Sequence, residues 1–252
     1  MNIDPLTGVL GAQINDVNLN DLNQHQINEL YHEICVHQVV VIPDQSLSPE
    51  EQTRFSHLLG PYSPVPFVEP IPGYPEVIKV IKKESESKAF NFGGVWHSDF
   101  SFLESPPAFT ILHALEVPTI GGDTVWTSNC AAYEALDDES KDRFETITCV
   151  HSASASYSPK QQSVHSGLSG MDIRTSTEAE ETREHPLVCK HPTTGDKSLF
   201  FNGTYVRGLK GDGINSPEDE LNLLIWLHNW TTHVRFTFRH RWSNGDVVIW
   251  DN

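Results

Sequence analysis

The amino-acid sequence predicts a mainly β protein with flanking helices, an antiparallel sandwich or barrel that forms one domain. Short apolar runs rich in β-branched and aromatic residues recur along the 252-residue chain, and turn-forming residues separate them. Segments with helical periodicity are few by comparison. The sequence shows no internal repeat or Gly/Ser linker, and its 38% hydrophobic content is enough for one sizeable core.

The first elements expected are a helix, a buried strand and a second helix. Residues 21–38 carry apolar side chains at helical spacing. Residues 39–42 are a run of β-branched residues, which is typical of a buried strand. Ser48 is the expected N-cap of the second helix, with Glu51 closing a capping box, and this helix is expected to end near Gly60.

Two longer segments are expected to leave the regular core. Residues 62–94 are rich in Pro, Gly and Ser, with one strand-like stretch at 76–81, and predict a long ordered loop that contacts substrate. Residues 151–184 are polar, Ser-rich and without clear periodicity, and predict a large excursion from the core. The remaining expected elements are strands at 109–115, 123–126, 198–202, 234–242 and 247–250, and helices that begin near 131 and 216.

The charge balance limits the classes of partner. Lys and Arg total 17 against 34 Asp and Glu, which gives a formal net charge of −17. Such a surface repels nucleic acid and anionic membranes, so neither is an expected partner, whereas a pocket with its own local positive charge can still take a small anionic substrate. The four scattered cysteines and the absence of a secretion signal predict reduced thiols and a cytoplasmic protein. The sequence leaves open whether the chain forms a homo-oligomer.

The most informative pattern is the His-x-Asp of His97 and Asp99, which lies between segments that resemble β-structure. If the pattern lies on a strand, both side chains point to one face and can reach the same metal ion. One imidazole and one carboxylate are two-thirds of the facial triad of non-haem Fe(II) oxygenases. The alternatives are a chance match in a chain with 13 histidines, or a tetrahedral zinc site.

The other histidines give no ligand assignment. His113 is expected to be a core histidine of an apolar strand. His151, His165, His185 and His191 are expected to be mostly solvated.

Further blocks of sequence give the His-x-Asp pattern a context. They cover residues 96–107, 121–128, 131–136, 185–188, 191–195, 199–202 and 241–252. Their content and order resemble the taurine dioxygenase (TauD/TfdA) family of 2-oxoglutarate-dependent oxygenases. The resemblance extends from about Val39 to the end of the chain, and several blocks together are far more specific than any one of them.

This resemblance implies a double-stranded β-helix (jelly-roll) fold over a single domain, residues 1–252, that lacks its C-terminal end. It implies Fe(II) held by His97 and Asp99, 2-oxoglutarate as co-substrate, and the Thr124 hydroxyl on the distal carboxylate of 2-oxoglutarate. For Thr124, strand propensity alone is the competing explanation. The third ligand, a distal His, and an Arg that pairs with 2-oxoglutarate are expected beyond Asn252, so the chain as given is expected to bind iron weakly.

The activity implied by the resemblance is hydroxylation of a small, anionic organic molecule by O2, with release of succinate and CO2. Sulfonates, sulfate esters and carboxylates are all candidate substrates. Residues 60–67 and 90–95 do not preserve the polar pattern of taurine-specific members, so taurine itself is not expected. A non-catalytic jelly-roll protein that binds a metal or a ligand is the main alternative, and a zinc hydrolase on the same scaffold is a more distant one.

Overall fold

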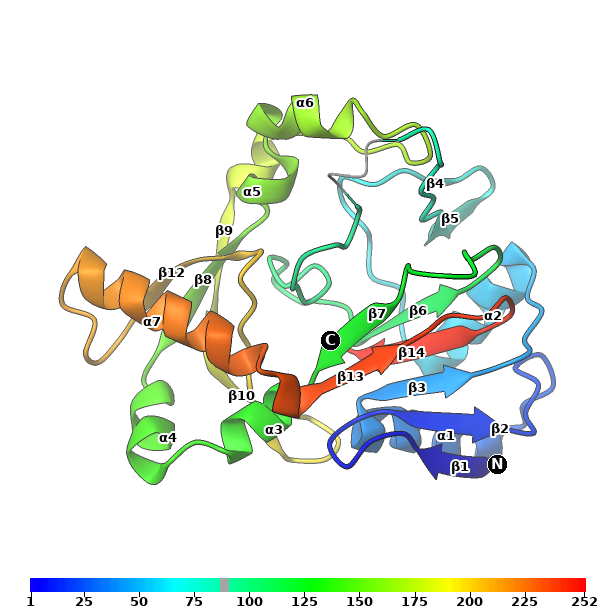
Figure 1. Ribbon diagram of the computed structural model, residues 1–252, viewed down its shortest axis with the longest axis horizontal. Helices are drawn as coiled ribbons and strands as arrows, with labels where there is room; N and C mark the ends of the chain where they lie inside the picture. The colour runs from blue at the N-terminus through cyan, green and yellow to red at the C-terminus, as the bar shows by residue number, and fades with distance from the viewer. Residues whose placement is uncertain (87–90) are drawn as a thin grey trace.

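The computed structural model describes residues 1–86 and 91–252, and Figure 1 shows its helices and strands. The helices, including short 3-10 turns (η), are α1 (Gln24–His37), α2 (Pro49–Leu59), α3 (Asn129–Glu134), α4 (Asp138–Phe144), α5 (Ser154–Tyr157), η1 (Pro159–Gln161), α6 (Gln162–His165), η2 (Thr177–Glu180), α7 (Pro217–Thr231) and η3 (Val234–Phe236). The strands of the first half are β1 (Asn2–Pro5), β2 (Ala12–Asn15), β3 (Val39–Ile42), β4 (Pro70–Ile71), β5 (Tyr74–Ile78), β6 (Phe109–His113) and β7 (Thr124–Thr127). Those of the second half are β8 (Thr148–Ser152), β9 (Thr182–Pro186), β10 (Val188–Lys190), β11 (Lys197–Leu199), β12 (Val206–Lys210), β13 (Thr237–His240) and β14 (Val247–Asp251).

The largest sheet joins strands from opposite ends of the chain in the order β1-β2-β3-β14-β6. β14 pairs antiparallel with both β3 and β6, so that Trp250 lies opposite Val39 on one side and Thr110 on the other. All four residues of β3 are buried, which confirms the strand predicted from its β-branched run. This pairing carries Asn252, which directly follows β14, to the beginning of β6.

The helices α1 and α2 pack apolar side chains, including Leu30, Ile34 and Phe55, into one cluster with buried residues of β3 and β14. Both begin where the sequence offers a cap. Asn23 and Gln26 form a capping box on α1, and Ser48 and Glu51 form the predicted one on α2. The predicted helix boundaries are therefore confirmed to within a few residues.

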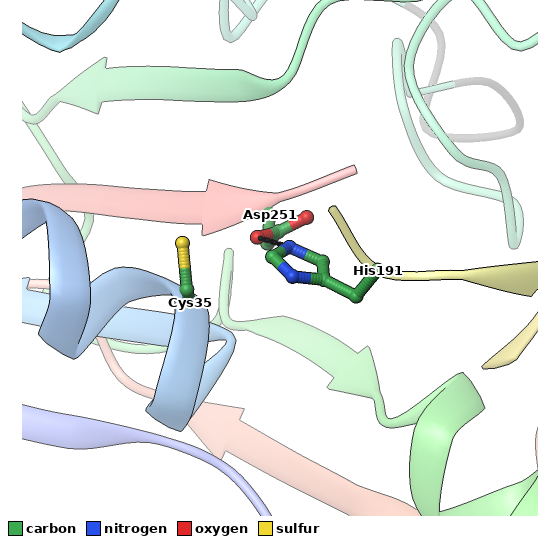
Figure 2. A group of neighbouring side chains, drawn as sticks. All are labelled: Cys35, His191 and Asp251. Carbon is green, nitrogen blue, oxygen red and sulfur yellow. Dashed lines mark hydrogen bonds and ion pairs between the residues drawn. The ribbon is translucent and has the colours of Figure 1, made fainter. Parts of the chain in front are cut away.

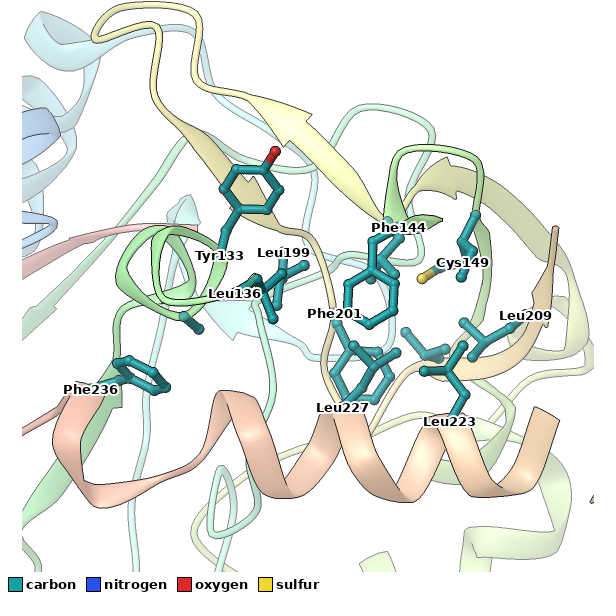
Figure 3. Close-up of a cluster of buried hydrophobic side chains, with 14 residues drawn as sticks. Tyr133, Leu136, Phe144, Cys149, Leu199, Phe201, Leu209, Leu223, Leu227 and Phe236 are labelled. Atoms are coloured by element: carbon teal, nitrogen blue, oxygen red, sulfur yellow. The ribbon is translucent and has the colours of Figure 1, made fainter. Parts of the chain in front are cut away.

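A second group of strands faces α7. The three-stranded sheet β12-β8-β9 and the β10-β11 hairpin lie on this side of the molecule, at the left of Figure 1. Figure 3 shows the apolar side chains that α7 and α3 bury with these strands, among them Leu223, Leu227 and Phe201. The helix expected to begin near 216 is thus α7, with Ser216 as its N-cap.

Several predicted elements have other limits than expected. The segment 151–184 is not wholly an excursion, because its first residues complete β8 and its last residues begin β9. The strand expected over 234–242 is a 3-10 turn followed by the short β13, and the strand expected over 198–202 is β11, which ends at Leu199. In the loop 62–94 the strand-like stretch shifts to β5, which forms a hairpin with β4. Residues 87–90 of that loop lie outside the described residues.

No helix within residues 1–86 or 91–252 is long and apolar enough to cross a membrane.

Candidate active site

His97 and Asp99 lie in the loop between β5 and β6, not on a strand. The expectation of a strand was therefore wrong in its local structure. The backbone runs without regular hydrogen bonding through His97 and enters a turn at Asp99, and Phe100 has a φ of 53°. The two side chains converge because of this turn and the contacts around it, and not because of strand alternation.

The imidazole of His97 is oriented by a backbone hydrogen bond to one nitrogen, which turns the other nitrogen toward Asp99. Nδ1 lies 2.7 Å from the carbonyl oxygen of Val95. A carbonyl can only accept, so Nδ1 carries a proton, and in the neutral imidazole Nε2 has the lone pair that a metal needs. A metal-binding histidine is commonly oriented in this way, by donating its second N–H to a backbone carbonyl.

The carboxylate of Asp99 is held by its other oxygen. The Thr110 hydroxyl, on β6, donates to Oδ2 at 2.7 Å, and the Trp250 side chain adds a hydrogen bond to the carboxylate. The Asn252 side chain links the two elements, because its Oδ1 accepts from the Asp99 N–H at 3.2 Å and its Nδ2 donates to the Thr110 hydroxyl at 2.9 Å. These contacts leave Oδ1 directed toward His97.

Nε2 of His97 and Oδ1 of Asp99 lie 3.1 Å apart. Two ligands bound at about 2.1 Å to one ion and at right angles to each other are about 3 Å apart, so this spacing fits neighbouring positions of an octahedral site. Without a cation between them, the two groups form an ion pair. Burial opposes charge on both groups, but their hydrogen bond and mutual attraction outweigh it, so the pKa of His97 is raised and that of Asp99 is lowered.

Thr124 begins β7 and pairs with His240 of β13. Its hydroxyl oxygen accepts a hydrogen bond from the indole N–H of Trp242 at 2.9 Å. The hydroxyl proton therefore remains available to a further acceptor, such as a carboxylate.

An aromatic wall lies beside His97. The ring of Tyr205 meets the imidazole edge to face at 6.4 Å and packs against Phe102 at 4.9 Å. Tyr157 hydrogen-bonds to Tyr205, and burial raises the pKa of Tyr157 to about 12 and that of Tyr205 well above its usual value, so both phenols stay neutral. With Phe67, which stacks on Tyr157, these side chains belong to one buried cluster. Tyr205 thus places an aromatic ring beside the His97–Asp99 pair, and the other rings of the wall pack with it in the same buried cluster.

A cavity of about 350 Å³ adjoins the aromatic wall, because Phe67 and Phe102 belong to both. Its polar lining is Glu104, Glu178, Glu181 and Arg183. Three carboxylates against one guanidinium disfavour an anionic group, so this cavity does not suit the charged end of an anionic substrate.

A second cluster of metal-ligating residue types joins Cys35 of α1, His191 and Asp251 of β14, whose ligand atoms lie within 4.8 Å of one another (Figure 2). It is the only such group of three among residues 1–86 and 91–252, so no third His, Cys or carboxylate completes the His97–Asp99 pair there. Nδ1 of His191 accepts the N–H groups of Thr193 and Thr194, which places the imidazole proton on Nε2, where it is donated to Asp251 at 2.9 Å. The proton on Nε2 of His191 occupies the position that a metal ion would need. The cluster therefore has a structural role, in which His191 links the turn that follows it to β14.

Sequence reasoning missed the partners of the His97–Asp99 pair. Thr110 lies on β6 and Asn252 directly follows β14, and only the sheet order brings these two residues together. The histidines expected to be solvated were also misjudged. His151 is completely buried, His165 is 9% exposed, and His185 and His191 are partly buried and hydrogen-bonded.

Comparison with known proteins shows which family the chain resembles. The model of the taurine catabolism dioxygenase TauD, TfdA family matches residues 2–252. An alpha-ketoglutarate-dependent sulfate ester dioxygenase of Pseudomonas putida is 29% identical over 100% of this chain and 81% of its own length. An alkylsulfatase of Acinetobacter baylyi is 32% identical over 100% of this chain and 77% of its own length.

Among solved structures, a taurine dioxygenase from Burkholderia xenovorans superimposes with a TM-score of 0.79 at 26% identity. The match covers 99% of this chain and 80% of that one. The fold is accordingly the jelly roll that the sequence resemblance implied.

Proposed function

This chain belongs to the taurine catabolism dioxygenase TauD, TfdA family, and on that premise we propose that His97 and Asp99 bind its catalytic Fe(II). The protein is an Fe(II)- and 2-oxoglutarate-dependent dioxygenase that hydroxylates a small anionic organic substrate and releases succinate and CO2. The observation that carries the residue assignment is the 3.1 Å approach of His97 Nε2 to Asp99 Oδ1, each group being fixed through its other polar atom.

The protein residues have separate tasks in this proposal. His97 and Asp99 hold the ion through one atom each, and they are the two protein ligands that the described residues supply to it. The Thr124 hydroxyl would donate a hydrogen bond to the distal carboxylate of 2-oxoglutarate, while the indole N–H of Trp242 orients that hydroxyl. When bound, Fe(II) and 2-oxoglutarate supply the oxidising power that converts a substrate C–H bond to C–OH.

We propose a sulfate ester with an apolar alkyl or aryl group as the substrate. The aromatic wall of Tyr205, Phe102, Tyr157 and Phe67 favours an apolar body beside His97. Taurine, a short zwitterion, would leave that surface without a partner. The Pseudomonas sulfate ester dioxygenase and the Acinetobacter alkylsulfatase, to which the chain is similar, support the same class. The four free thiols support a cytoplasmic location, and the net charge of −17 supports the proposal that nucleic acid and membranes are not partners.

The assignment is tested with the protein expressed from its complete gene. Succinate release is measured under O2 with Fe(II), 2-oxoglutarate and a panel of sulfate esters, sulfonates and carboxylates, and Fe(II) binding is measured by anaerobic titration. His97→Ala and Asp99→Ala are each expected to abolish Fe(II) binding and to reduce turnover by at least about a thousandfold, because they remove a metal ligand.

His25→Ala is the matched control, since His25 is exposed on α1 and far along the chain from the ligand pair. It should bind iron and turn over like the wild type. Retained Fe(II) binding by folded His97→Ala would contradict the assignment of His97 as a metal ligand. Turnover of taurine in preference to every sulfate ester would contradict the substrate proposal alone.

A further inference from the structure

We propose that His151 and Asn202 are positioning residues for the metal site, which they hold in place through the hydroxyl of Ser101. The inference rests on the proposed function, since it takes His97 and Asp99 as the metal ligands. Neither His151 nor Asn202 contacts the ligand pair, and each acts on the turn that follows it.

Ser101 is the point of attachment. It lies two residues after Asp99 and its side chain is completely buried. Nδ2 of Asn202 donates to its hydroxyl oxygen at 2.9 Å, and Nδ1 of His151, on β8, lies 3.1 Å from the same oxygen. The amide of Asn202 cannot be reversed, because its Oδ1 accepts the backbone N–H of Tyr205 at 2.8 Å. Since Asn202 is the donor, the hydroxyl proton of Ser101 is free to be donated to His151.

The turn needs such an anchor because it is strained. Phe100, between Asp99 and Ser101, has a φ of 53°, in the left-handed region that a residue with a bulky side chain rarely adopts. A conformation of this kind persists only where the surrounding structure holds it. Its position next to a proposed metal ligand means that relaxation of the turn would rotate the Asp99 carboxylate away from His97.

Two further contacts from the same part of the molecule hold the loop at its ends. The Thr204 hydroxyl donates to the carbonyl of Trp96 at 2.6 Å, and His185 Nε2 donates to the carbonyl of Leu103 at 2.9 Å. The loop that carries His97 and Asp99 is therefore held at Asp99 by side chains of β6 and of the end of β14. Along the rest of its length it is held by side chains of β8, β9 and the turn before β12. Ser101 is the only one of these points where two buried side chains meet.

The surroundings of His151 indicate that its imidazole serves the hydrogen bond to Ser101 and not packing alone. It is completely buried, and its Nε2 has no hydrogen-bond partner among residues 1–86 and 91–252. It stacks on Phe200 at 5.4 Å and meets the ring of His185 at 5.1 Å. A leucine would fill such a site without leaving a buried nitrogen unsatisfied, so the imidazole is explained by its one hydrogen bond, to Ser101.

The test compares His151→Leu with His151→Asn in the protein expressed from its complete gene. Asparagine retains a polar atom near the position of Nδ1, and leucine does not. The Fe(II) dissociation constant is measured anaerobically on folded protein, and the ratio of succinate to hydroxylated product is measured in turnover. We expect His151→Leu to raise the dissociation constant by about tenfold or more and to form succinate in excess of product, whereas His151→Asn stays close to the wild type.

Cys149→Ala is the control, because it creates a cavity in the same strand without contact to Ser101, and it should lower stability while leaving iron affinity unchanged. If His151→Leu does not fold, Ser101→Ala removes the same contact with less loss of volume, and the same tenfold loss of affinity is expected. Wild-type affinity and coupling in folded His151→Leu or Ser101→Ala, or an equal loss in the Asn and Leu variants, would overturn the inference. Loss of Fe(II) binding in His97→Ala, measured in parallel, shows whether the proposed metal site itself stands.

Discussion

The two oxygens of the Asp99 carboxylate have different surroundings. Oδ2 accepts the Thr110 hydroxyl, while Oδ1 lies 3.1 Å from His97 Nε2. A carboxylate fixed through one oxygen presents only the other to a cation, so Asp99 is suited to bind as a monodentate ligand. Asn252 reinforces this orientation, because it contacts both the Asp99 backbone and the Thr110 hydroxyl.

Thr110→Val tests this role at the level of one hydrogen bond. Valine has the shape of threonine and lacks the hydroxyl, so the fold should persist while the Asp99 carboxylate gains rotational freedom. Fe(II) affinity, measured by anaerobic titration, is expected to fall by about tenfold or more. Thr127→Val is the control, since it also removes a strand hydroxyl, one that bonds the carbonyl of Thr231 instead. An equal loss of iron affinity in both variants would contradict the role given to Thr110.

At the scale of single elements, the cap of α2 offers a direct measurement. Ser48 accepts the N–H of Glu51 at 3.2 Å, and the Glu51 carboxylate accepts the N–H of Ser48 at 2.8 Å. Ser48→Ala should lower the free energy of unfolding by about 1 kcal/mol, because the N–H of Glu51 in the first turn loses its side-chain acceptor. Chemical denaturation of the variant checks this, with Ser46→Ala in the preceding loop as the control. A midpoint equal to that of the wild type would contradict the capping role.

Elements whose signal is local were predictable from the sequence. α1, α2 and α7 carry caps and apolar spacing within their own residues, and β3 carries four β-branched residues in a row. β13 differs, because Val234–Phe236 form a 3-10 turn first, and the apolar run gives no sign of where the ladder to β7 begins.

The His97–Asp99 pair could be singled out from the sequence, but its geometry could not be predicted. His97 and Asp99 stand in a recognisable block of sequence, whereas the turn that brings them together depends on Phe100 in a left-handed conformation, for which nothing in the sequence is a signal. His151 was expected in solvent because its neighbours are serines. It is buried because β8 pairs with both β9 and β12, and such pairings join distant segments.

At the scale of the whole molecule, burial of His151 makes the stability of the fold depend on pH. Desolvation, with the positive charges of His185 and Arg207 nearby, lowers the pKa of His151 to about 4. In the unfolded chain its pKa returns to about 6.5, so between pH 6.5 and 4 the unfolded state binds a proton that the folded state does not. Stability from this group is complete above pH 6.5 and is lost as the pH falls toward 4, by roughly 3 kcal/mol at most.

Thermal unfolding at pH 7 and pH 5 provides the measurement. The wild type should lose more stability over this interval than His151→Leu, which carries no titrating group at the position. Other ionisable groups contribute equally to both proteins, so the difference between the two pH dependences reports on His151. Parallel curves for the two proteins would contradict a buried, neutral imidazole in the folded state.

The sheet order has a consequence for how the protein is made. β14 lies between β3 and β6, yet about 130 residues of chain separate it from β6 and about 200 from β3. On the ribosome, β3 and β6 emerge long before the strand that joins them, and their apolar edges have no partner during most of translation. The nascent chain is accordingly most prone to aggregate before β14 emerges, and a chaperone that shields exposed strand edges should raise the yield of native protein more than it alters the stability of the finished fold.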